Sequence, residues 1–233
     1  MAKVTNTPPA RTRKARPERP GTSAQLVHHL TFQAELQEWA RLRELAAARN
    51  VDVGAKPAER AAQFIALARD AIQSLDGSVA SALLTFHVRT GWHEGWDLTK
   101  RTQYPKGQGR GFLQMEPGAA IDAIDRATRK KWIDKLAAAA ATTAGQLQDA
   151  AKELSLGSPW PAGNLIEEKL LGYDLFALMM ARAYLSRLPD AVPADIVLQS
   201  DFWEKHWHRV VAPQKKAKWL DDAKRLDKLV TWS

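Results

Sequence analysis

A glutamate stands between two tryptophans in a stretch that has no helical period. Residues 91–113 read GWHEGWDLTKRTQYPKGQGRGFL and are rich in glycine, aromatic and polar residues. Glu94 has Trp92 and Trp96 beside it, and rings that exclude water raise the pKa of a carboxyl group. A glutamate with a pKa of about 4.3 is protonated about once in 500 molecules at pH 7, and one with a pKa of about 6 about once in ten. Glu94 is therefore our candidate general acid, able to protonate a leaving oxygen.

The two tryptophans and the polar residues that follow could complete such a site. An indole face can stack on a sugar ring, although Trp92 and Trp96 could equally pack in a core. Hydrolysis of a glycosidic bond needs a second carboxylate about 5–9 Å from the acid. The candidates for it are Asp97 and Glu116. Glu116 also precedes a proline, where an acidic residue favours a helix N-terminus. The residues that could hold a sugar by hydrogen bonds, or simply be solvated, are Gln103, Tyr104 and Gln114.

The sequence lacks the residues and motifs that several other kinds of catalysis and metal binding need. There is no cysteine, which excludes disulfides, thiolate catalysis and Cys-based metal sites. His28 and His29 are adjacent, and His206 and His208 are two apart, so each pair diverges on a helix and we expect no metal site. No phosphate-binding glycine loop, nucleophile elbow or dinucleotide fingerprint occurs. We therefore expect no cofactor.

The elements that must position Glu94 are predicted to be helices. The chain has 233 residues, 45% apolar and 26% charged, as expected for one principal globular domain. Apolar residues at spacings of three and four predict helices over about 22–49, 57–76, 79–91, 118–126, 129–154, 165–187, 194–210 and 214–232. The fold class is thus mainly α, with at most a short β-hairpin between Asp97 and Phe112. Arg182 lies on an apolar helix face, and we expect it to pair with a carboxylate such as Asp174 or Glu116.

The first 21 residues differ from the rest of the chain. They are rich in proline and basic residues, so we predict a flexible basic arm. Of the formal net charge of +8, the arm carries +5, which leaves about +3 for the remainder. The arm could bind DNA or a neighbouring subunit, or be a solvated tail; its basic residues are Lys3, Arg11, Arg13, Lys14, Arg16 and Arg19. We divide the chain into this arm (1–21), an N-terminal helical pair (22–77) and a helical domain (78–233).

The order of these motifs resembles a known superfamily. GRGFLQMEP, from Gly109 to Pro117, follows Glu94 as a Gly-x-x-Gln segment follows the acid in goose-type lysozymes and lytic transglycosylases, and it looks like the Gly-x-x-Gln-Met-Glu-Pro segment of lysozyme-like proteins of tailed bacteriophages. The later YDLFALMMARAYLSR, LPDAVP and FWEKHW are similar in order and spacing to the C-terminal half of those proteins. The resemblance covers roughly residues 78–225, and Gly95 stands where the family usually has Ser or Thr.

The resemblance implies a fold and a function. It implies a lysozyme-like helical domain in which Glu94 is the acid and Gln103, Gln114 and Tyr104 position the sugar. The expected protein is virion-associated and cleaves the glycan strand of peptidoglycan during genome entry, as a lytic transglycosylase or lysozyme. Its partners would be peptidoglycan, other virion proteins and, through the arm, DNA. We expect it to be made in the host cytoplasm, with no signal peptide or integral membrane segment.

Two alternatives stay open at this point. In another register Thr90 occupies the family's acid position, and a threonine cannot supply the proton. The protein would then be a catalytically inactive lysozyme-like structural or ejected virion protein whose basic arm contacts DNA or neighbouring subunits. A DNA-binding protein proper is a poorer interpretation, because the excess basic charge is confined mainly to the arm.

Overall fold

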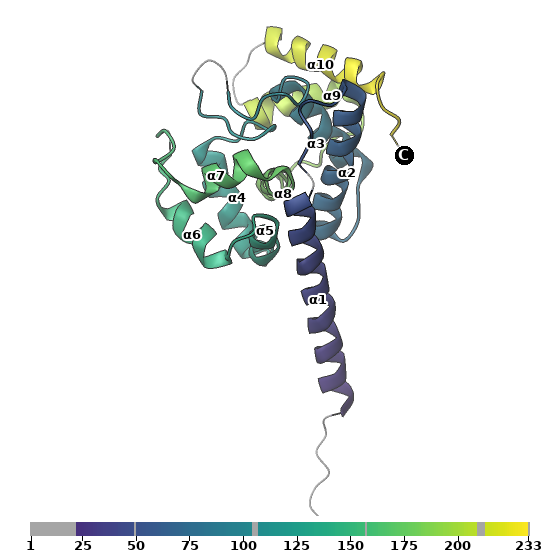
Figure 1. Cartoon of the computed structure of the whole chain (residues 1–233). Helices are drawn as coiled ribbons and strands as arrows, with labels where there is room; N and C mark the ends of the chain where they lie inside the picture. The colour runs from purple at the N-terminus through teal and green to yellow at the C-terminus, as the bar shows by residue number, and fades with distance from the viewer. Residues whose placement is uncertain (1–21, 49, 104–106, 157, 209–212, 233) are drawn as a thin grey trace, which may run out of the picture. The chain divides into compact units, whose positions relative to one another are not determined.

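The structure is a computed structural model, and it describes residues 22–48, 50–103, 107–156, 158–208 and 213–232 (Figure 1). In these residues the only β pairing is two isolated bridges, Thr102 with Arg110 and Arg110 with Met115, and the remaining regular structure is helical. The expectation of a mainly α fold is confirmed. None of the helices in the described ranges is long and apolar enough to span a membrane.

Contacts divide the chain into residues 1–37 and residues 38–233. Helix α1 (Thr22–Ala48) crosses this division, and its residues Phe32 and Leu36 are exposed. In the larger unit, Leu42 of α1 is fully buried, and α2 (Pro57–Asp76) packs against two later helices. Helix α2, which belongs to the expected N-terminal helical pair (22–77), buries its apolar face in the core of the larger unit.

The centre of the larger unit is α8 (Asp174–Leu185), almost all of which is buried. It packs against α2, α4 (Pro117–Arg129), α5 (Ile133–Ala139) and α7 (Leu165–Gly172). Helix α6 (Ala144–Lys152) covers α4, α5 and α7. An apolar helix surrounded in this way gains most of its stability from burial rather than from helix propensity.

A second group of helices packs around α3 (Ser81–Glu94), as Figure 1 shows. Helix α3 contacts α2 on one side and α10 (Pro213–Asp227) on another, and α10 contacts α9 (Ile196–Phe202). Helix α9 continues directly into a π-helix, η1 (Trp203–His208). Wider turns of this kind often occur at functional sites, because they move side chains out of the regular helical register.

The sequence signals for helix ends hold at several positions. Pro57 begins α2, and Gly77, with φ of 77°, ends it through a bond from its N–H to the carbonyl of Gln73. The side chains of Asn164 and Asp195 accept hydrogen bonds from the first turns of α7 and α9. Helix α3, in contrast, runs three residues past its expected end.

Candidate functional site

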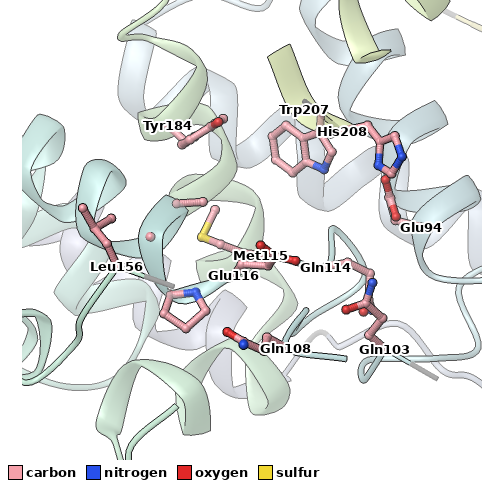
Figure 2. A pocket seen from close by; sticks show the side chains of 13 residues that line it. Glu94, Gln103, Gln108, Gln114, Met115, Glu116, Leu156, Tyr184, Trp207 and His208 are labelled. Carbon is pink, nitrogen blue, oxygen red and sulfur yellow. The ribbon is translucent and has the colours of Figure 1, made fainter. Parts of the chain in front are cut away.

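A cavity of about 470 Å³ opens where several parts of the chain meet (Figure 2). The end of α3 supplies Glu94, α8 supplies Tyr184, and η1 supplies Trp207 and His208. The segment before α4 and the start of that helix supply the remaining wall, together with one leucine. These residues are Gln103, Gln108, Gln114, Met115, Glu116, Pro117, Gly118, Ala119 and Leu156. The cavity thus has an aromatic side and a side rich in amide and carboxyl groups.

Glu94 is half-buried at the C-terminal end of α3. Its Oε1 accepts a hydrogen bond of 3.0 Å from Nε1 of Trp203. Burial raises the pKa of Glu94, while His93, the bond from Trp203 and Lys215 act in the opposite direction. The net direction is upward, which keeps a larger fraction of the carboxyl group protonated and able to donate.

Trp203 is the centre of an aromatic cluster behind Glu94. Its ring stacks on His208 at 4.9 Å and on Trp219 at 6.3 Å, and His93 meets it edge-on at 5.2 Å. Nδ1 of His93 lies 2.7 Å from a carboxylate oxygen of Asp222 on α10. Trp203 is therefore fixed on several sides, and its N–H holds the Glu94 carboxyl group in one place.

The glutamine segment forms the wall opposite the aromatic side. Gln114 has a φ of 49°, and its Nε2 donates to the carbonyl of Gly111 at 2.7 Å. Its Oε1 is buried and has no hydrogen-bond partner among the described residues. Gln103 is exposed, and its Oε1 accepts a bond from the backbone N–H of Gly109 at 3.2 Å. Glu116 is exposed at the N-cap of α4 and caps no backbone N–H with its side chain.

Three of the residues singled out in the sequence do not line this cavity. Trp92 is only 1% exposed, because α3 continues to Glu94 and turns Trp92 into the core. Trp96 is 62% exposed but lies outside the cavity lining. Thr90 is fully buried one turn before Glu94 and also lies outside the lining, so of these two candidates for the acid position only Glu94 reaches the cavity. Trp92 thus packs in the core, which was the alternative stated for it, and neither indole lies where it could stack on a sugar in this cavity.

Asp97 is turned away from Glu94 by an unusual turn. Trp96, Asp97 and Leu98 all have φ between 51° and 59°, the left-handed region that is unfavourable for side-chain-bearing residues. The turn is held by a bond of 2.9 Å from Nε of Arg60 to the carbonyl of Asp97. The Asp97 carboxylate pairs with Arg225 at 2.5 Å. Of the two expected second carboxylates, Glu116 lines the cavity and Asp97 does not.

The aromatic side of the cavity was not predicted from the sequence. Trp207 lines it and meets the ring of Tyr184 edge-on at 5.5 Å, and His208 lies next to them on η1. The signal in the sequence was the aromatic segment FWEKHW, which contributed only to the resemblance to phage proteins. Tyr104 and the six basic residues of the arm lie outside the described residues. In the described ranges no three His, Asp or Glu side chains gather in a way that could hold a metal ion.

No protein-family model, curated protein sequence or solved structure matches this chain.

Proposed function

We propose that the protein cleaves the glycan strand of peptidoglycan, with Glu94 as the general acid. The observation that carries the proposal is the position of Glu94: it is half-buried, lines the cavity and has a raised pKa. In this reaction the protonated carboxyl group donates its proton to the glycosidic oxygen as the C1–O bond breaks. The resemblance of the Glu94 and QMEP segments to phage lysozyme-like proteins supports the choice of substrate and a role in the virion during genome entry.

The carboxyl groups around Glu94 favour cleavage of the lytic transglycosylase type, which needs one acid. A hydrolase of the ordinary kind needs a second carboxylate near the acid. Asp97 is paired with Arg225 outside the cavity, and Glu116 lines the cavity but is exposed. In the transglycosylase reaction the N-acetyl group of the sugar assists, and an anhydro sugar forms. The Gln114 side chain lines the cavity, and its amide suits the hydrogen bond to a sugar amide or hydroxyl group that this reaction needs.

The test is digestion of purified Gram-negative peptidoglycan by the wild-type protein, by Glu94→Gln and by Glu116→Gln, with mass spectrometry of the released muropeptides. We expect anhydro muropeptides from the wild type and from Glu116→Gln, and none from Glu94→Gln. Release of reducing-end products that needs both carboxylates would instead indicate a lysozyme. No release by folded wild-type protein, beside an active lysozyme, would overturn the proposal in favour of a structural virion protein.

A further inference from the structure

One indole holds two titratable groups of the cavity together. Trp203 donates its N–H to Oε1 of Glu94 at 3.0 Å, and its face stacks on the imidazole of His208 with ring centres 4.9 Å apart and planes inclined by 4°. Both Glu94 and His208 line the same cavity, and Figure 2 shows the imidazole beside the carboxyl group. The two side chains come from α3 and η1, so the packing of Trp203 fixes their relative positions.

The imidazole of His208 has a nitrogen without a partner. Its Nε2 is buried and accepts or donates no hydrogen bond among the described residues. Most buried polar atoms in proteins have a partner, so an unpaired one needs an explanation. His206, on the same π-helix, shows the ordinary arrangement, since its Nε2 lies 3.0 Å from the carboxylate of Asp190.

The surroundings of His208 favour the neutral ring. Burial lowers the pKa of His208, and electrostatic interactions with Lys215 on α10 and His93 on α3 lower it further, whereas Glu204 on η1 acts in the opposite direction. A neutral imidazole has one ring nitrogen that accepts a proton. At the same time burial raises the pKa of Glu94. The pKa values of these two groups are shifted in opposite directions. Glu94 is therefore suited to donate a proton, and His208 is suited to accept one.

We infer that His208 is the base of the cleavage reaction proposed above: it accepts the proton of the hydroxyl group that attacks C1 of the sugar. The inference rests on the proposed function. The C1–O bond to the leaving sugar breaks, and the leaving oxygen takes the proton of Glu94. The oxygen of the attacking hydroxyl, from the sugar itself or from water, bonds to C1 and gives its proton to a ring nitrogen of His208. Transfer of a proton from the imidazolium to the Glu94 carboxylate restores both groups, so no proton is gained or lost.

The position of the other carboxyl groups supports this division of roles. Asp97 is paired with Arg225, and Glu116 is exposed at the cavity rim at the start of α4. His208, in contrast, stacks on the indole that donates a hydrogen bond to Glu94. A base held by the same indole as the acid is positioned in advance of the reaction, which is how positioned groups accelerate a reaction.

The test compares His208→Gln with Glu94→Gln and with His206→Gln as a matched control on the same π-helix. Glutamine keeps a polar side chain but does not accept the proton. We expect His208→Gln to lower kcat by about 10²–10⁴-fold. KM should stay within about twofold, because the lost interaction is made in the transition state. His206→Gln should cleave like the wild type.

Azide separates a base from a merely structural residue. It attacks C1 without losing a proton, so azide should restore bond cleavage and give a glycosyl azide with His208→Gln, and should not do so with Glu94→Gln. Wild-type rates in His208→Gln, or a loss in the folded variant that azide does not restore, would overturn the inference while leaving the proposed function intact.

A second measurement does not depend on activity. We expect NMR titration of His208 in the full chain to give a pKa below the ordinary histidine value, and a pKa at or above that value would overturn the role as a neutral acceptor. An inactive wild-type protein would instead overturn the proposed function.

Discussion

Nε1 of Trp203 lies 3.0 Å from Oε1 of Glu94 and joins the π-helix η1 to the end of α3. The bond favours the charged form of Glu94 and therefore opposes the effect of burial, which favours the neutral form. Burial is the larger effect, so the pKa stays raised. The acid of the proposed reaction is thus held in position by a donor that also limits how far its pKa can rise.

Replacing Trp203 by Phe should move the pKa of Glu94 further up. The ring stays but the N–H is lost, and a hydrogen bond to a charged group contributes about 1.5–3 kcal/mol, or about one to two pKa units. The alkaline limb of the pH profile of cleavage should therefore move to higher pH by about one to two units. Trp219→Phe is the control, because Trp219 stacks on Trp203 and its buried Nε1 has no hydrogen-bond partner in the part of the chain that the structure describes. An equal shift in both variants would contradict this assignment.

The stability of Glu94→Gln relative to the wild type should depend on pH. Burial raises the pKa of Glu94 in the folded protein above its ordinary value, so ionisation opposes folding. The stability that depends on a neutral Glu94 is complete at low pH and is lost as the pH rises through the folded pKa. The loss is about 1.4 kcal/mol for each unit of the pKa shift. The variant should therefore gain stability relative to the wild type as the pH rises above the ordinary pKa of a glutamate. Urea unfolding at a series of pH values measures this, and a relative loss on raising the pH would rule it out.

His87 should make the protein sensitive to acid. It is buried, its Nδ1 lies 2.8 Å from the carbonyl of Leu83, and its Nε2 has no partner among the described residues. Burial lowers the pKa of His87 to about 4. The unfolded chain then binds a proton that the folded chain does not, so stability falls as the pH drops from about 6.5 to about 4, by about 3 kcal/mol.

His87→Leu removes the group that binds this proton and replaces it with an apolar side chain of similar size. The free energy of unfolding should fall less in the variant than in the wild type between about pH 7 and pH 4. Equal losses in the two proteins would show that other groups cause the acid sensitivity.

Much of the fold was predictable because helix signals are local. Pro57, Gly77 and the apolar spacings placed α2 correctly, and the period of 3.6 residues needs no knowledge of distant contacts. Gly91 was misleading. A glycine after an apolar helix usually indicates its end, but a side chain at Gly91 would collide with the ring of Phe64 on α2. The glycine permits close packing of two helices, so α3 continues to Glu94.

The parts that depended on long-range pairing were not predictable. Arg182 was expected to pair with Asp174 or Glu116, and instead it binds Asp76 at the end of α2 at 2.6 Å. Asp174 is paired with Arg101 at 2.7 Å, from the segment before the glutamines. Similarly, nothing local to His208 indicates that it stacks on the tryptophan that binds Glu94. The sequence indicates what kind of partner a charged or aromatic residue needs. It does not indicate which of several candidate residues the fold brings close to it.

Gly95 should be intolerant of a side chain, which gives a physical reason for glycine directly after the acid. A Cβ at this position would lie 2.7 Å from the carbonyl oxygen of Gly91 and 2.9 Å from Cδ1 of Phe112, a ring that is itself buried. Relief of the clash must displace either the last turn of α3 or the core. We expect Gly95→Ala to lower the free energy of unfolding by about 1–3 kcal/mol. Because Glu94 is the adjacent residue, cleavage should fall as well.

Gly145→Ala is the matched control for that variant, because a Cβ at Gly145 on α6 would meet nothing within 4 Å. Alanine restricts the unfolded chain and suits a helix, so this variant should be unchanged or more stable by up to about 1 kcal/mol. Urea unfolding of both variants with the wild type gives the comparison. If Gly95→Ala were as stable as Gly145→Ala, the end of α3 would have room to adjust, and close packing would no longer explain why glycine follows Glu94.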